Sequence, residues 1–317
     1  MHTFDLLVIG DANPDVILGP LDAPLAFGQR EQLVSRGTLT LGGSGAIVAC
    51  GAASLGLRVG FIGRVGDDDA GRYVRDALAA HGVNTRGLHL DPEQSTPLTV
   101  ILTRDQDRAI ITAPGTLAAT TAEDIPQDLL TSTRHVHTAS YFLMPQLAKA
   151  LPDVLRTARE HGATTSLDTN DDPAGAWDPA GMNGVLRHVD YLLPNAAEAQ
   201  HLAGLDLPDA HKAAETLAAR GPVTVVKMGA EGALCHDGTR LLTTDGIPVQ
   251  PADAVGAGDS FDAGFIVGML FRFTLAEALQ LAAACGALST RAHGGTTAQP
   301  NWDEVRPYIT SNGKHLT

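Results

Sequence analysis

The chain has 317 residues, with 36 acidic against 22 basic side chains and a formal net charge of −14. This acidic balance repels nucleic-acid backbones and anionic membranes, so we expect neither as a partner. The three cysteines are too widely spaced for a disulfide framework or a zinc site, and no signal peptide or apolar span of about 20 residues is recognisable, so we expect a cytoplasmic protein.

Short apolar runs alternate with helical patterns along the chain. Residues 6–9, 59–62, 135–139, 164–167, 191–193 and 223–226 predict buried strands, and residues 69–80, 146–161, 210–219, 264–271 and 276–290 predict helices. Such alternation is typical of right-handed βαβ crossovers. We therefore predict one α/β domain over residues 1–317, with a doubly wound, mostly parallel sheet and helices on both of its faces.

Two segments interrupt this alternation. Residues 28–40 and 96–112 predict antiparallel strands, with a polar turn at residues 105–107 in the second segment. We expect lid segments at about residues 12–40 and 95–113 that form a small antiparallel β lid over the main domain, or a dimer surface. An edge hairpin without a role is the alternative.

The most specific motif is the string DAVGAGDSFDAGF at residues 253–265. Gly256 and Gly258 permit a tight turn into a helix whose unpaired N–H groups can bind an anion. Asp259 lies at the same place, where a carboxylate can take the proton of an attacking hydroxyl while the helix N-terminus stabilises a transferred phosphoryl group. A glycine-rich helix start without catalytic function is the alternative.

This string resembles the C-terminal signature of the ribokinase-like, or PfkB, family of carbohydrate kinases, and the resemblance spans nearly the whole chain. It implies an ATP-dependent kinase that transfers the γ-phosphoryl group to a hydroxyl of a small carbohydrate. By the same resemblance, Asp259 is the catalytic base, and the backbone of Gly256, Ala257 and Gly258 forms the anion hole.

Further segments resemble the family's acceptor-binding elements. Asn13 and Asp15 follow the first strand, where ligands gather at the carboxyl ends of a parallel sheet, although Asn, Pro and Asp also form simple turns. The glycine-rich segment 42–49 resembles the N-terminal signature, but Ile47 stands where the family usually has a sugar-binding Asn. The residues carried over as substrate ligands are Asn13, Asp15, Gly42, Gly43, Ser44 and Arg108, although Arg108 could equally be a solvated side chain. Ser140, which follows the strand at residues 135–139, is a further candidate substrate ligand.

The resemblance also implies sites for the nucleotide and for cations. Glu198 belongs to an N-x-x-E motif and is expected to hold Mg²⁺ through water, although a helix capping box explains the same spacing. Asp253 lies where the family often binds a monovalent cation, so K⁺ is a further expectation. The ATP contacts carried over are Asn195, Lys227, Gly229 and Gly232, the last three in a loop that is otherwise a plain β-turn between strands.

Other functions fit the sequence less well. There is no G-x-G-x-x-G after the first strand, which argues against a dinucleotide-dependent enzyme, and His135 with His137 lacks a third metal ligand. A ligand-sensing, non-catalytic relative is the second alternative. The resemblance further implies a homodimer that pairs through the lid.

The acceptor classes can be ranked from the same residues. A neutral or sugar-acid carbohydrate is favoured over a nucleoside, for which Ile47 would make room. A phosphosugar is ranked last, because Arg108 is the one basic residue of the substrate motifs.

Overall fold

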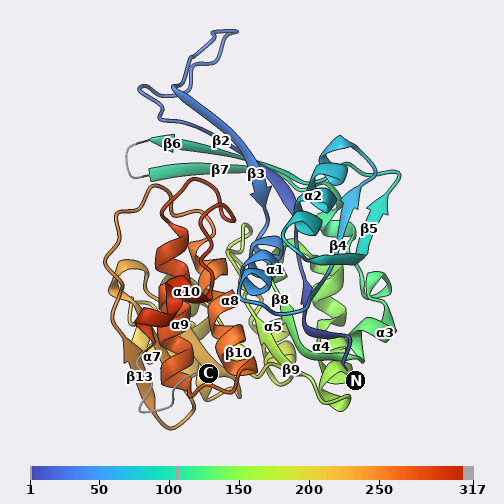
Figure 1. Ribbon diagram of the computed structural model, residues 1–317, viewed down its shortest axis with the longest axis vertical. Coiled ribbons are helices and arrows are strands. Elements are labelled where there is room, and N and C mark those ends of the chain that lie inside the picture. The colour runs from blue at the N-terminus through green and yellow to red at the C-terminus, as the bar shows by residue number, and fades with distance from the viewer. Residues whose placement is uncertain (1, 105–106, 310–317) are drawn as a thin grey trace.

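The computed structural model describes residues 2–104 and 107–309, and Figure 1 shows a layered body with a projecting β lid. The main sheet has nine strands in the order β13-β12-β11-β10-β9-β8-β1-β4-β5. Seven are parallel: β1 (Phe4–Ile9), β4 (Val59–Gly66), β5 (Asn84–Asp91), β8 (Thr133–Thr138), β9 (Thr164–Leu167), β10 (Tyr191–Leu192) and β11 (Val223–Lys227). The edge strands β12 (Ala233–His236) and β13 (Leu241–Thr244) are antiparallel to β11 and to each other.

Alternation along the buried strands divides the core into two layers. In β1, Leu6 and Val8 belong to one apolar cluster, whereas Leu7 and Ile9 belong to the other. Helices α1 (Ser44–Ser54), α2 (Asp69–Ala80), α8 (Ala257–Leu270), α9 (Leu275–Ser289) and α10 (Trp302–Val305) contribute to the first layer. Helices α3 (Gln127–Leu130), α4 (Pro145–Glu160), α5 (Pro179–Leu186), α6 (Ala196–Ala203) and α7 (Ala210–Ala218) contribute to the second.

Short 3₁₀ helices complete the connections, at η1 (Gly115–Ala119), η2 (Ala122–Asp124), η3 (Tyr141–Leu143), η4 (Gly229–Glu231) and η5 (Arg306–Tyr308). The predicted fold class, a doubly wound and mostly parallel α/β sheet with a small lid, is confirmed. The predicted helix at 264–271 is the second half of α8, which begins at Ala257. Within the described part of the chain, no helix combines the length and apolar character needed to cross a bilayer.

The lid is a separate sheet with the order β3-β2-β6-β7. Strands β2 (Asn13–Gly19) and β3 (Arg36–Gly42) form one antiparallel pair, β6 (Leu98–Arg104) and β7 (Asp107–Ala113) form another, and β2 joins them by pairing with β6 in parallel. The order of the large sheet reverses between β1 and β8, and the lid rises beside this point. Open α/β sheets bind their ligands at such a reversal.

One expectation about the lid needs correction. Residues 28–35 are not a strand, because β3 begins only at Arg36. The segment at Asn13, for which a simple turn was the alternative, is a strand. Pro14 is compatible with this strand since its pairing with β6 starts one residue later, at Asp15, so the missing N–H removes no bond from that ladder. In the expected polar turn, Asp105 and Gln106 lie outside the described residues.

Candidate active site

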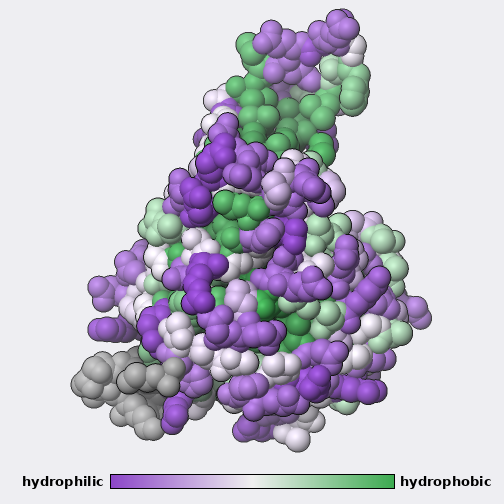
Figure 2. All heavy atoms as spheres, turned by 90° about the vertical axis from the view of Figure 1, so that its right-hand side faces the viewer, coloured by the Kyte–Doolittle hydropathy of each residue, from purple (hydrophilic) through white to green (hydrophobic). Residues whose placement is uncertain are grey.

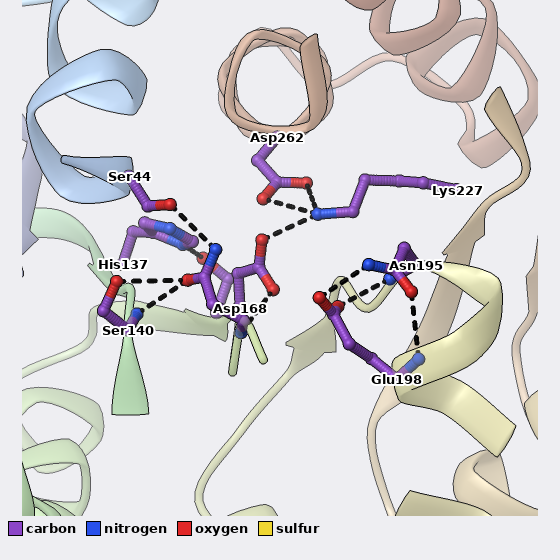
Figure 3. Close-up of polar contacts among 10 residues, drawn as sticks. Ser44, His137, Ser140, Asp168, Asn195, Glu198, Lys227 and Asp262 are labelled. Atoms are coloured by element: carbon purple, nitrogen blue, oxygen red, sulfur yellow. Dashed lines mark hydrogen bonds and ion pairs between the residues drawn. The ribbon is translucent and has the colours of Figure 1, made fainter. Parts of the chain in front are cut away.

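The candidate residues gather at the carboxyl edge of the large sheet, below the lid. Asp11 follows β1, Ser140 follows β8, Asp168 and Asn170 follow β9, and Lys227 ends β11. Figure 3 shows that the side chains of Ser140, Asp168 and Lys227, which come from three of these segments, gather beneath the helix that carries Asp262. The site is therefore assembled by the topology of the sheet, from segments that are far apart in the sequence.

Helix α8 begins with a turn that only glycine fits easily. Gly256 precedes the helix with a left-handed φ of 72°, and a Cβ atom there would lie 2.6 Å from the Cα atom of Gly295. Within the residues that the structure describes, no carbonyl accepts a hydrogen bond from the N–H of Gly258 or of Asp259. Of the residues predicted to form the anion hole, Ala257 instead donates its N–H to the Ala254 carbonyl at 3.4 Å. Gly258, together with Asp259, presents a free N–H group at the positive end of the helix.

Asp259 lies in the first turn of α8 and is only 9% exposed. Its pKa is raised from 3.8 to about 7, mainly because burial disfavours the charged form and secondly because the Asp168 carboxylate is near. The ammonium group of Lys227 and a hydrogen bond from Ser44 act in the opposite direction. A carboxyl group with a pKa near 7 is well suited to exchange a proton with a hydroxyl substrate at neutral pH.

A hydrogen-bonded network joins the acceptor side of the site. The Asp11 carboxylate accepts from the hydroxyl of Ser140 at 2.8 Å and from the backbone N–H of Ser44 and Gly45 at 3.2 and 3.0 Å. The Asn170 amide donates to the Ser44 hydroxyl at 2.8 Å and accepts from the Ser140 N–H at 2.9 Å. Ser140 and Asn170 have left-handed φ angles of 58° and 54°, a strained conformation that such networks hold in place at functional sites.

The lid supplies a second polar group from β2. The Asn13 amide donates to the Asp15 carboxylate at 2.7 Å and to the Thr99 hydroxyl at 3.2 Å. Burial raises the pKa of Asp15 to about 7, opposed by the bond from Asn13 and reinforced by nearby carboxylates. A Cβ atom on Gly42 would lie 2.1 Å from the Asp15 carboxyl carbon, so glycine is required opposite this residue.

Ile47 does not open the site as expected. Its side chain is 3% exposed, and added Cβ atoms on Gly295 and Gly256 would lie 2.4 and 3.2 Å from its Cδ1 atom. The isoleucine therefore fills the space behind the two glycine turns. The expectation that it makes room for a nucleoside base is not supported by this packing.

A cavity of about 570 Å³ extends from the start of α8 toward β11 and α9. Such a volume is usual for a small-molecule site. Three of the four expected ATP contacts, Lys227, Gly229 and Gly232, line it, together with Gly258 and an apolar wall that includes Val249 and Ala287. A phosphate chain at the free N–H groups of α8 and an adenine base against the apolar wall fit this shape.

Asn195 and Glu198 form a complete capping box at the start of α6. The Asn195 N–H donates to Glu198 Oε2 at 2.8 Å, its side-chain amide donates to Oε1 at 2.6 Å, and the Glu198 N–H donates to Asn195 Oδ1 at 2.9 Å. Burial, and next the charge of Asp168, raise the pKa of Glu198 to about 7. Asn195 and Glu198 therefore cap α6, as the alternative explanation proposed. The Glu198 carboxyl group also lies beside the site, where a nearby cation would stabilise its charged form.

Three other residues that were predicted to bind substrate or a cation have different surroundings. Asp253 accepts hydrogen bonds from the N–H of Gly294 and of Val255, both at 3.0 Å, so it anchors the 291–295 segment from which further cation ligands were expected. Arg108 lines a groove on the lid and is absent from the lining of the main cavity. Gly43 has a φ of 89° and precedes α1 without a side-chain cap.

Several polar residues of the site were missed in the sequence. Asp262 lies inside the DAVGAGDSFDAGF string, whereas Asp168 and Asn170 directly follow a predicted strand; these positions were the available signals. Lys227 donates to Asp168 at 2.7 Å and to Asp262 at 3.1 Å. His137, by contrast, bonds to Ser166 on the neighbouring strand, at 2.8 Å.

Comparison with known proteins identifies the family of the chain. The family model described as "pfkB family carbohydrate kinase" matches residues 3–302. An ATP-dependent ribose-1-phosphate kinase of Halopiger xanaduensis is 32% identical over 313 residues, which cover 96% of this chain and 98% of the relative. A 2-dehydro-3-deoxygluconokinase of Bacillus subtilis is 29% identical over 285 residues, with 86% and 87% covered.

The solved structures agree in fold. The structure of Arabidopsis thaliana ribokinase complexed with ribose and ATP superimposes with a TM-score of 0.83 at 24% identity, and the match covers 97% of this chain and 99% of that one. The match to the family model extends over nearly the whole chain, including the turn at Gly256 to Asp259. The chain therefore belongs to the pfkB family of carbohydrate kinases and is an ATP-dependent carbohydrate kinase.

Proposed function

We propose that this kinase phosphorylates a hydroxyl group of a small neutral carbohydrate, with Asp259 as the base. The observation that carries the proposal is the Asp259 carboxyl group, whose pKa is raised to about 7 and which lies beside the free N–H groups of α8. A proton acceptor and an anion site are thus adjacent, as transfer of a phosphoryl group to a hydroxyl requires.

Charge favours a neutral acceptor over an anionic one. The carboxyl groups of Asp11, Asp259 and Asp253 add to the rise in the pKa of Asp15 that burial causes, so negative charge is concentrated near the acceptor side of the site. Sugar hydroxyls donate hydrogen bonds to such groups, whereas a carboxylate or phosphate on the acceptor would be repelled by them.

The proposed reaction divides its tasks among the residues of this chain. Asn13, Asp15 and the network around Asn170 hold the acceptor, and ionised Asp259 takes the proton of the attacking hydroxyl. The N–H groups of Gly258 and Asp259 bind the transferred phosphoryl oxygens and stabilise their negative charge. As the new bond to the acceptor oxygen forms, the bond between the γ-phosphorus and the β,γ-bridging oxygen breaks and ADP is the leaving group. Asp259 keeps the proton and releases it to water when the site opens.

Cations complete the proposal. Glu198 would hold Mg²⁺ through water, and the ion would neutralise charge on the phosphates of ATP. A K⁺ ion beside Asp253 and the 291–295 segment is a second cation in the proposal. The raised pKa of Glu198 shows that its carboxylate charge is unfavourable where it is buried. A cation bound near Glu198 would offset this cost.

The lid is proposed to close over the acceptor and to pair two subunits. Strand register aligns Leu39, Val16, Val100 and Ile111 as one row across all four lid strands, and Leu39 and Ile111 are each 56% exposed. Figure 2 shows apolar side chains gathered over the projecting lid. An exposed apolar row of this kind is typical of a subunit interface, here within a cytoplasmic homodimer.

Other acceptors are less favoured by the site. The names of the Halopiger and Bacillus relatives specify a phosphosugar and a sugar acid, so both classes are alternatives to a neutral sugar as the acceptor. A nucleoside acceptor was an alternative because Ile47 was expected to make room for a base. The buried position of Ile47 removes that argument. A non-catalytic, ligand-sensing protein is the remaining alternative.

A direct test is ATP consumption measured with neutral sugars, sugar acids, ribose 1-phosphate and nucleosides, in the presence of Mg²⁺ and K⁺. We expect the highest kcat/KM for a neutral sugar. A higher value for ribose 1-phosphate or for a nucleoside would contradict the acceptor class. Absence of turnover with every acceptor would favour the ligand-sensing alternative.

A further inference from the structure

A buried ion cluster lies directly below the start of helix α8. Lys227 Nζ donates to Asp168 Oδ2 at 2.7 Å and to the two Asp262 carboxylate oxygens at 3.2 and 3.1 Å. The three side chains are 11%, 3% and 0% exposed, in the order Lys227, Asp168 and Asp262. Figure 3 shows the lysine ammonium group bonded to both carboxylates, of which Asp168 directly follows β9 and Asp262 belongs to α8.

Stability alone does not explain this cluster. Burying charged groups costs several kcal/mol for each ion, and apolar side chains of similar size usually stabilise a core as well as an ion pair does. The surrounding layer is apolar, with Val225 and Phe265 fully buried on the same strand and helix. Three charged residues in this layer therefore suggest a function that needs a cation at this point.

The carboxylates of this cluster are spaced as for a metal ion, and the lysine ammonium group takes the place of that ion. Oxygen atoms of Asp168, Asp259 and Asp262 lie within 4.8 Å of one another, close enough to hold a metal ion. Lys227 is already bonded to two of them, so the cluster carries its own cation. Its ammonium group is held charged because these carboxylates raise the pKa of Lys227 against the effect of burial.

The lysine lies against the anion-hole turn. A Cβ atom on Gly258 would lie 3.6 Å from Lys227 Nζ and 3.8 Å from Cδ and Cε. The Gly258 N–H is one of the free donors at the start of α8. The ammonium charge thus lies immediately behind the backbone that would bind a phosphoryl group, on the side turned toward the carboxylates.

We propose that Lys227, fixed by Asp168 and Asp262, is a positioning residue that supplies positive charge behind the anion hole and favours the γ-phosphoryl group of ATP. This inference rests on the proposed phosphoryl transfer. The ammonium charge favours ATP over ADP because it lies at the Gly258 turn, where the γ-phosphate would bind. Asp168 and Asp262 prevent the flexible lysine side chain from turning away.

The test compares two variants that differ only at the lysine. Asp168→Asn retains the oxygen that accepts from the Asn170 N–H and leaves Lys227 bonded to Asp262. Lys227→Met with Asp168→Asn removes one positive and one negative charge together, so the net charge of the cluster stays that of the wild type, although the buried Asp262 loses its cationic partner. Lys212→Met with Glu215→Gln removes an exposed ion pair on α7 and is the matched control.

Calorimetry without acceptor measures the Kd of each protein for Mg²⁺ with ADP and for Mg²⁺ with AMP-PCP, the ATP analogue with a β,γ-methylene group. We expect the double variant to lose about tenfold in AMP-PCP affinity and less than threefold in ADP affinity, relative to Asp168→Asn. Its kcat on an accepted sugar should fall about 100-fold, as for removal of one oxyanion donor. The surface control should bind both nucleotides as the wild type does.

Equal losses for ADP and AMP-PCP, or no loss for either, would overturn the proposal. Should the methionine variant not fold, Lys227→Gln with Asp168→Asn repeats the comparison. Because the nucleotide measurement needs no acceptor, it decides the role of Lys227 even where the acceptor screen contradicts the proposed function.

Discussion

Replacing Asp259 by asparagine should stabilise the folded protein at pH 8 while it removes turnover. The carboxyl group is buried, and burial together with the neighbouring Asp168 charge raises its pKa from 3.8 to about 7. Between these two values the folded state holds a proton that the unfolded state has released. Stability therefore falls as pH rises from about 4 to about 7, and the full cost is present at pH 8.

The magnitude follows from the two pKa values. Their difference, at 1.36 kcal/mol per pH unit, corresponds to about 4 kcal/mol at pH 8, which is an upper limit because solvent and nearby groups relax. At pH 5 most of this cost is still absent. Asparagine has nearly the same shape as aspartate and carries no charge. The free energy of unfolding that Asp259→Asn gains over the wild type should therefore be about 2–3 kcal/mol larger at pH 8 than at pH 5.

Urea unfolding of both proteins at pH 5 and pH 8, without nucleotide or Mg²⁺, measures this difference. Asp237→Asn is a suitable control, because the pKa of that carboxyl group is lowered by hydrogen bonds and its removal should destabilise the protein at pH 8. If Asp259→Asn were no more stable than the wild type at pH 8, or if its effect were equal at both pH values, the raised pKa would be wrong.

Three further variants test separate parts of the site. Glu198→Gln should retain the cap of α6 but raise the Mg²⁺ concentration for half-maximal rate about tenfold; an unchanged titration would limit Glu198 to capping. Asn170→Ala should raise KM for the acceptor about tenfold through loss of its bonds to Ser44 and Ser140, with KM for ATP unchanged, whereas equal changes in both would refute an acceptor role. Ile111→Arg should halve the mass measured by sedimentation, because a charge in the apolar row would be buried in the dimer; an unaltered mass would exclude this surface as the interface.

The sequence predicted the large sheet well because its strands are buried on both faces. The run at Leu6 to Ile9 is apolar throughout, which is the pattern of a central parallel strand. Strand β2 was missed because Asn13, Pro14 and Asp15 have turn propensity, and only the pairing with β3 and β6 makes this segment extended. Long-range pairing of this kind is not visible in local composition.

The same limit applies to the site. Residues within one motif, such as Gly256 and Asp259, could be placed together because a turn and a helix start fix their distance. Asp168, Lys227 and Asp262 lie 59 and 35 residues apart along the chain, and only the order of β9, β11 and α8 brings their charges into contact. Ile47 was misjudged for a related reason, since its packing against Gly295 depends on a segment almost 250 residues later.

Single-turnover transfer of a labelled γ-phosphoryl group from ATP to an accepted sugar tests most directly whether Asp259 is the base. The enzyme is held in excess at pH 8, and the phosphorylated sugar is quantified after rapid quenching. We expect Asp259→Asn to transfer at least about 1000-fold more slowly than the wild type while its Kd for AMP-PCP stays within threefold, since a general base that also orients the hydroxyl contributes on this scale. A variant that retains a tenth or more of the wild-type rate would contradict the assignment.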